Sequence, residues 1–141
     1  MDRTLARAHA MELIYEWEMG GDGGEETRLN LLEVAPDERE SDFMNAMFEG
    51  VVANAEAIDA RLKPFLRGWT LERLTRVDLA ILRLAVYELT LGETSRSIVI
   101  NEAVELANRY STDKAGAFVN GVLGNLARAM DDEAAAAEAE P

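Results

Sequence analysis

Residues 71–91 read LERLTRVDLAILRLAVYELTL, and this stretch decides the fold. Its apolar side chains point in almost every direction around a helix instead of forming one stripe: Leu74, Val77, Leu79, Ile81, Leu82, Leu84, Val86 and Leu89. A helix that is apolar all round is normally surrounded by other elements. We therefore predict that residues 71–91 form a central helix with the remaining helices packed around it.

Helical periodicity also accounts for the segments before the central helix. An apolar stripe over residues 6–17 ends at the glycine-rich residues 20–24, and a weaker amphipathic segment follows over about residues 25–34. The next stripe is the longest one, with Ser41 as its expected N-cap and Pro64 as its end. We predict one helix for each of these three segments.

Two more helices are predicted after the central one. Ser97 is the expected cap of a helix that extends to Tyr110, and residues 118–126 form the apolar stripe of the last helix. No stretch of strand length combines a period of two with β-branched residues, apart from residues 97–100, which are too few. The sequence thus predicts an all-α protein, a compact bundle of about six to seven helices with short connections.

Length and composition limit the class of protein. The chain has 141 residues, of which 48% are apolar, as in a globular domain. No apolar run approaches the ~20 residues that cross a bilayer, and no hydrophobic signal region follows the start, so we expect a cytoplasmic protein without a membrane partner. We expect residues 1–130 to form the domain and residues 131–141, DDEAAAAEAEP, to be an acidic, disordered tail.

The net charge of -13 argues against bulk attraction to nucleic acid. Removing the tail, which has five acids and no bases, still leaves -8 for residues 1–130. Any RNA binding must therefore be local or shared with a basic partner.

Few side chains are suited to catalysis. The chain has no cysteine, and its one histidine, His9, has only Glu12 and Glu16 as candidate acid–base partners. Glu102 and Glu105 lie one helical turn apart, but a calcium site needs a dense loop of oxygen ligands. We expect a solvated histidine and a solvated acidic helix face, with no metal site, no cofactor and no enzymatic activity.

The first helix contains a candidate nucleic-acid site. Arg3 and Arg7 are four residues apart and share a helix flank, and Tyr15 emerges within roughly 80° of Arg7. Single-stranded RNA recognition uses positive charge for phosphates and a flat ring for an unstacked base. On spacing alone, the alternative is better supported: both arginines are ordinary surface residues and Tyr15 lies at the edge of the core.

Acidic residues at the central helix form a second candidate site, a surface that could bind a protein. Glu72, Asp78 and Glu88 have few bases near them, which would suit a basic partner. Surface acids are usually only solubilising, so this pattern is also weak by itself.

Several strings of this chain resemble the NusB family. They are VDLAILRLAVYEL at residues 77–89, INEAVELA at residues 100–107 and FVNGVL at residues 118–123. The opening, Arg7-Ala8 followed by LIYEW at residues 13–17, and Lys63-Pro64-Phe65 are similar to the family too, so that the resemblance extends over roughly residues 3–128. Several ordered motifs at consistent spacing are more specific than any one of them.

The resemblance implies two helical subdomains around a shared core and a non-enzymatic role in transcription antitermination. Together with a small-subunit ribosomal protein known as NusE, the family binds boxA RNA of ribosomal RNA operons and joins an RNA polymerase complex that reads through terminators. Position by position, it implies RNA contacts by Arg3, Arg7, Tyr15, Phe65, Tyr110 and Lys114. It implies a partner-facing surface formed by Glu72, Asp78 and Glu88.

Two alternatives and some departures accompany this resemblance. The chain could be a protein–protein adaptor of the same fold with little RNA binding, or a detached NusB-like domain of an RNA cytosine methyltransferase. Many family members open with three or more clustered basic residues, where this chain has only Arg3 and Arg7, and Lys114 replaces an acid of some relatives. Because some members self-associate, we expect a monomer or a weak homodimer.

Overall fold

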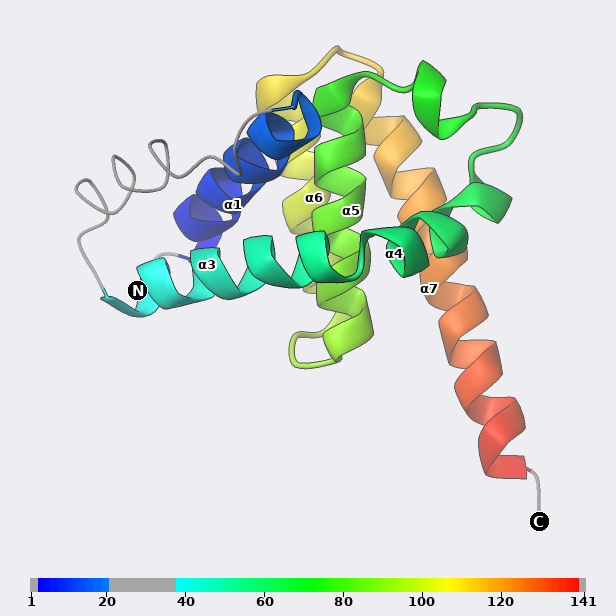
Figure 1. Ribbon diagram of the computed structural model, residues 1–141. Coiled ribbons are helices and arrows are strands. Elements are labelled where there is room, and N and C mark those ends of the chain that lie inside the picture. The colour runs from blue at the N-terminus through cyan, green and yellow to red at the C-terminus, as the bar shows by residue number, and fades with distance from the viewer. Residues whose placement is uncertain (1–2, 21–37, 140–141) are drawn as a thin grey trace.

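The structure is a computed structural model that describes residues 3–20 and 38–139. In these two ranges the chain forms six α-helices, two short 3-10 helices and no strand (Figure 1). The α-helices are α1 (Arg3–Glu18), α3 (Glu38–Ala53), α4 (Ala55–Leu62), α5 (Arg76–Leu91), α6 (Arg96–Tyr110) and α7 (Ala115–Ala139), and the 3-10 helices are η1 (Lys63–Phe65) and η2 (Leu71–Arg73). The predicted all-α fold is confirmed, while the helix expected at about residues 25–34 lies outside the described residues.

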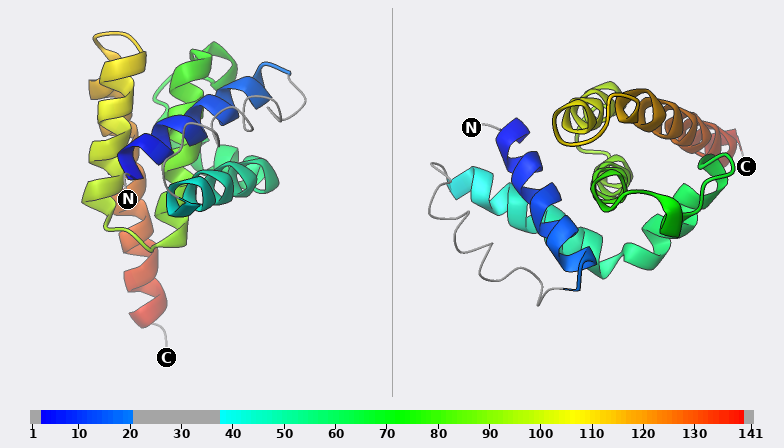
Figure 2. Two further views of the ribbon diagram at one scale, coloured as in Figure 1. Left: turned by 90° about the vertical axis from the view of Figure 1, so that its left-hand side faces the viewer. Right: turned by 90° about the horizontal axis from the view of Figure 1, so that it is seen from above.

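Helix α5 is the centre of the bundle, as its apolar pattern predicts. It contacts α1 and α3 on one side and α6 and α7 on the other, and α4 also packs against it (Figure 2). Of its 16 residues, 11 are buried. The pair α1–α3 and the pair α6–α7 thus form two helical subdomains that share one apolar core.

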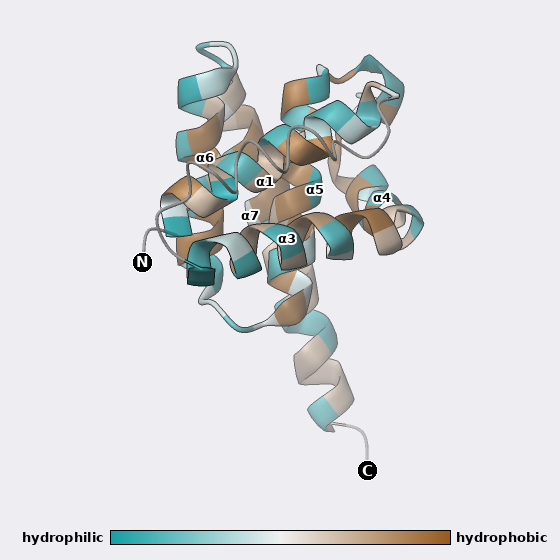
Figure 3. Ribbon diagram, turned by 60° about the vertical axis from the view of Figure 1, so that its left-hand side comes forward, coloured by the Kyte–Doolittle hydropathy of each residue, from teal (hydrophilic) through white to brown (hydrophobic). Residues whose placement is uncertain are grey.

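The apolar residues of the outer helices face that core. Buried apolar residues of α1, α3, α6 and α7 belong to one cluster with those of α5. Figure 3 shows the apolar and hydrophilic segments alternating along the helices, as expected for helices with one buried face. Among the described helices, none is both long and apolar enough to cross a membrane.

The central helix is shorter than predicted at its N-terminal end. Residues 71–73 form η2, and α5 begins only after Thr75, whose hydroxyl oxygen accepts a hydrogen bond of 3.1 Å from the backbone N–H of Asp78. Such a side-chain cap satisfies one of the free N–H groups of the first turn and marks the helix start. At the other end Gly92, with φ 68°, closes the helix in the left-handed conformation that favours glycine.

The longest predicted helix is broken at Asn54 into α3 and α4. The side-chain amide of Asn54 donates a 2.8 Å hydrogen bond to the carbonyl of Gly50, and its backbone leaves the helical region at φ -117° and ψ 17°. Asparagine competes with the helix through such local bonds. The predicted N-caps are wrong as well: α3 begins before Ser41, and Ser95, not Ser97, precedes α6.

Helix α7 extends into residues 131–141, the segment that the sequence predicts to be a disordered tail. Its residues 131–139 are helical and exposed, and they project beyond the bundle (Figure 1). Alanine has the highest helix propensity, which favours continuation of a helix already begun. Two ion pairs also link this part to the bundle, Arg61–Glu133 at 3.2 Å and Arg96–Asp131 at 3.1 Å. The disorder prediction is therefore wrong for residues 131–139.

Candidate nucleic-acid interface

The candidate site on α1 does not form as the helix spacing predicts. Arg3 is exposed, and its guanidinium lies 4.7 Å from the ring centre of Phe43. Tyr15 is exposed near the other end of α1. Arg7, which lies between Arg3 and Tyr15 in the predicted RNA site, is only 4% exposed.

Arg7 belongs to a buried ion pair between α1 and α5. Its Nε and Nη2 atoms donate hydrogen bonds of 2.9 and 2.7 Å to the two carboxylate oxygens of Glu88, which is 3% exposed. A carboxylate oxygen of Glu102 lies 3.7 Å from Nη1. Burial lowers the pKa of Arg7, but the hydrogen bonds and charge of Glu88 outweigh burial, so the net direction is upward.

This pairing corrects two sequence predictions. Arg7 was expected to contact RNA and Glu88 to contact a protein partner, and both roles require a surface position. The structure instead places both side chains in the interior, where each neutralises the other. We therefore assign neither residue to a binding surface.

A second buried arginine, Arg83, connects three helices. Its Nε and Nη2 atoms donate hydrogen bonds of 2.9 and 2.8 Å to Asp59 of α4, and its Nη1 donates to Glu18 of α1. Arg76 also donates to Glu18, at 2.9 Å. These contacts fix α1 and α4 on the central helix, which is a structural role.

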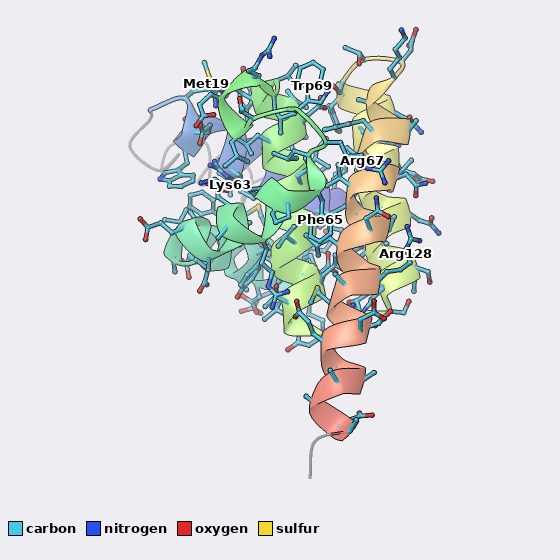
Figure 4. All side chains as sticks on the ribbon, turned by 90° about the vertical axis from the view of Figure 1, so that its right-hand side faces the viewer. Met19, Lys63, Phe65, Arg67, Trp69 and Arg128 are labelled. Carbon is cyan, nitrogen blue, oxygen red and sulfur yellow. The ribbon has the colours of Figure 1, made fainter. Side chains whose placement is uncertain are left out.

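A different face contains an aromatic pair, in which one ring is exposed and the other is half-buried. Trp69, in the bend between η1 and η2, is 52% exposed, and its ring packs edge to face against Phe118 in the first turn of α7, with 6.4 Å between ring centres. Figure 4 looks onto this side of the molecule, with Phe65, Arg67, Trp69 and Arg128 labelled. We call the surface around the aromatic pair the Trp69 face: Phe65, Arg67, Trp69, Arg73, Lys114, Phe118 and Arg128.

Two pockets flank the aromatic pair. One has a volume of about 410 Å³, and Phe65, Arg67 and Arg128 are among its lining residues. The other, which we call the Asp78 pocket, has a volume of about 370 Å³, and its lining includes Asp78 and Lys114. Trp69 and Phe118 line both pockets.

The cations of the Trp69 face lack carboxylate partners within the described part of the chain. Arg73 lies 5.8 Å from the ring centre of Trp69, and Arg128 donates to the amide oxygen of Asn125. Neither they nor Arg67 and Lys114 have a carboxylate oxygen of a described residue within ion-pair distance. By contrast, arginines elsewhere in the described part of the chain are ion-paired, among them Arg7, Arg61, Arg76, Arg83 and Arg96. Local positive charge is thus available beside the exposed ring of Trp69.

Among the described residues that line the pocket of Lys114, Asp78 is the one acid. It is 8% exposed, and its Oδ1 atom is buried without a hydrogen-bond partner among the described residues. The family resemblance of the sequence implies a protein contact for Asp78 and an RNA contact for Lys114. The structure places both in one pocket, so these two surfaces are not separate.

The remaining predicted residues are spread around the molecule. Phe65 is half-buried at the larger pocket, and Tyr110 is exposed at the end of α6 without lining either pocket. Glu72 is exposed on η2, and hydrogen bonds from its own backbone N–H and from Thr70, with smaller effects of nearby cations, lower its pKa. Arg3 and Tyr15 lie on α1, away from the Trp69 face.

Sequence reasoning missed most of the Trp69 face. Arg67, Trp69, Arg73 and Arg128 follow no helical stripe, and Phe118 belongs to an apolar stripe that reads as core. The one available signal was a tryptophan next to Gly68 in a polar bend, where a large ring has little core to enter.

Comparison with known proteins decides the family. The model of the NusB family matches residues 4–128. This chain belongs to the NusB family. The transcription antitermination protein NusB of Acetivibrio thermocellus is 42% identical over 130 residues, which cover 91% of this chain and 90% of that protein. The NusB of Listeria welshimeri is 37% identical over 128 residues, covering 90% of this chain and 97% of that protein.

Solved structures of NusB proteins have the same fold. NusB of T. maritima superimposes with a TM-score of 0.79 at 30% identity, covering 91% of this chain and 92% of that one. A chain in the crystal structure of the antitermination factors NusB and NusE with double-stranded RNA has a TM-score of 0.81 at 28% identity, covering 90% and 96%. The family resemblance of the sequence motifs is thereby confirmed.

Proposed function

We propose that this protein is a non-enzymatic transcription antitermination factor that binds boxA RNA of ribosomal RNA operons together with a small-subunit ribosomal protein acting as NusE. The observation that supports this proposal is the Trp69 face, where the exposed Trp69 ring and the half-buried Phe118 ring lie among cations that no described carboxylate neutralises. The relatives are named for antitermination, and one similar structure contains NusE and RNA.

The RNA is bound by the Trp69 face. Arg67, Arg73, Lys114 and Arg128 contact phosphates, while unstacked bases pack against Trp69 and Phe118. Four phosphate contacts on a single strand correspond to a salt slope of about -3. Phe65 completes this surface, and Arg3, Tyr15 and Tyr110 contact RNA that extends past it.

The basic partner offsets the acidity of the chain. A net charge of -13 opposes RNA capture by the protein alone, and a basic ribosomal protein raises both the rate and the specificity of association. Of the three acids assigned to the partner, Glu72 is exposed and is the residue we keep for this contact. The pair acts in the cytoplasm within the RNA polymerase antitermination complex, and the protein alone is a monomer or a weak homodimer.

A titration of labelled boxA RNA tests this function. The protein is added with and without the ribosomal partner at two salt concentrations, as the wild type, as Trp69→Ala and as Arg61→Ala. Arg61 is the matched control, because it is exposed but paired with Glu133 and lies outside both pockets. We expect boxA-selective binding that needs the partner, is weakened by Trp69→Ala and is unchanged by Arg61→Ala.

Two results would contradict the proposal. RNA binding without preference for the boxA sequence would show that the boxA signal is not the specific ligand. Binding of the partner without any RNA binding would instead support a protein–protein adaptor of the same fold.

A further inference from the structure

The Asp78 pocket contains a buried acceptor that lacks a donor. Asp78 is 8% exposed, and no described residue donates a hydrogen bond to its Oδ1 atom, although its own backbone N–H donates to Thr75. Nearly all buried polar groups in proteins have a partner, because an unpaired one loses its hydration without compensation. The terminal torsion of an aspartate is soft, so either carboxylate oxygen can turn toward the pocket. The free acceptor therefore calls for a donor from a ligand.

The charges around Asp78 select the kind of ligand. Arg73 and Lys114 line the same pocket, which gives two positive charges to one negative charge. A lysine or arginine side chain of a protein partner would be attracted by Asp78 and repelled by both cations. A nucleotide fits this pattern better, because its base is neutral and can donate hydrogen bonds while its phosphate is anionic.

The shape and lining of the pocket also fit a base. Its volume of about 370 Å³ lies within the roughly 300–1,000 Å³ of small-ligand sites. Trp69 and Phe118 provide aromatic surface, and Leu74 and Ala115 are apolar. A flat ring can thus stack in the pocket with its edge toward Asp78 and its phosphate near Arg73 or Lys114.

The donor pattern distinguishes between the bases. An ionised carboxylate only accepts hydrogen bonds. Guanine has two adjacent donors, N1–H and the N2 amino group, on its Watson–Crick edge, whereas adenine and cytosine place an acceptor beside their amino group and uracil has one N–H between two carbonyls. We infer that the Asp78 pocket binds an unpaired guanine of the RNA, with both donors directed to the Asp78 carboxylate. This inference rests on the proposed function and specifies one base of its ligand.

A base substitution in the RNA tests the inference without altering the protein. Two labelled single-stranded oligonucleotides are compared, oligouridine with one central guanine and the same strand with inosine, which lacks only the N2 amino group. Each is titrated, by fluorescence anisotropy, into wild-type protein with its ribosomal partner. We expect guanine to bind roughly 10-fold tighter or more, the effect of one hydrogen bond to a charged group.

Two charge-matched variants locate the preference. Asp78→Asn should bring the guanine-to-inosine ratio close to one, because the amide no longer offers two acceptors. Asp113→Asn removes the same charge from an exposed acid beside Lys114 that does not line the pocket, and it should keep the preference. Thermal unfolding of both variants checks that the comparison is made on folded protein.

Each outcome bears on a different claim. Equal affinity of the wild type for guanine and inosine overturns the inference and leaves the proposed function standing. A guanine preference that survives Asp78→Asn, with weaker binding of the ribosomal partner, overturns it in favour of a protein contact at Asp78. If boxA RNA itself does not bind even with the partner, the proposed function fails, and the inference fails with it. If boxA RNA binds but the guanine strand does not, the inference alone is overturned.

Discussion

The buried Arg7–Glu88 pair gives a prediction that separates structural arginines from RNA-binding ones. Arg7→Met keeps much of the side-chain volume and leaves the Glu88 carboxylate, 3% exposed, without the two hydrogen bonds of 2.9 and 2.7 Å. Removing one partner of a buried ion pair costs about 3–5 kcal/mol. In a domain of this size this corresponds to a fall of the melting temperature by roughly 10 °C or more.

The control is Arg61→Met, which breaks an exposed ion pair with Glu133 on the surface. Exposed pairs contribute about 0–1 kcal/mol, so this variant should unfold within a few degrees of the wild type. Both variants are followed by urea and thermal unfolding, and boxA RNA affinity is measured below the transition. Arg7→Met should be much less stable while its folded form keeps the RNA affinity of the wild type. If Arg7→Met is as stable as Arg61→Met but loses RNA affinity, Arg7 is a surface RNA contact and our assignment is refuted.

Three other predictions concern packing, the end of α7 and the charge of Glu72. Gly50→Ala should lower the free energy of unfolding by about 1–3 kcal/mol in urea, because a Cβ atom at residue 50 would lie 2.0 Å from the ring of Tyr87; unchanged stability would contradict this close approach. Deletion of residues 131–141 should shift the melting temperature by only a few degrees, since only surface ion pairs link residues 131–139 to the bundle; a large loss would show that this end of α7 contributes to the core. NMR titration should find the pKa of Glu72 below its ordinary value, because its carboxylate accepts hydrogen bonds from its own backbone N–H and from Thr70. The stability that these bonds contribute is then present near neutral pH and is lost as pH falls through the lowered pKa. An ordinary pKa would contradict these hydrogen bonds.

The fold could be predicted because it depends on periodic burial. The apolar pattern of α5 places it at the centre. Each of the other helices buries one face against the core, and a single apolar stripe in the sequence marks that face. The exact ends depend on single hydrogen bonds. Thr75 caps α5 and Asn54 interrupts the α3–α4 segment, and neither bond has a periodic pattern in the sequence.

The candidate site was much less predictable, because its contacts join residues far apart in the chain. Helix spacing relates Arg7 to residues three or four positions away, but its partner Glu88 is 81 positions away. The Trp69 face likewise combines a bend with the first turn of α7, where Phe118 meets Trp69. No pattern along one helix can show such a pair, although the family motifs already named Phe65 and Lys114.

The measurement that tests the RNA assignment most directly is the salt dependence of boxA binding in the presence of the ribosomal partner. Each phosphate contact on a single strand contributes about 0.7 to the slope of log affinity against log salt. Replacing both Arg67 and Arg128 with alanine should reduce that slope by about 1.4, and Arg7→Met should leave it unchanged. A slope that falls with Arg7→Met, and stays the same without Arg67 and Arg128, would place the RNA on α1 and contradict the Trp69 face.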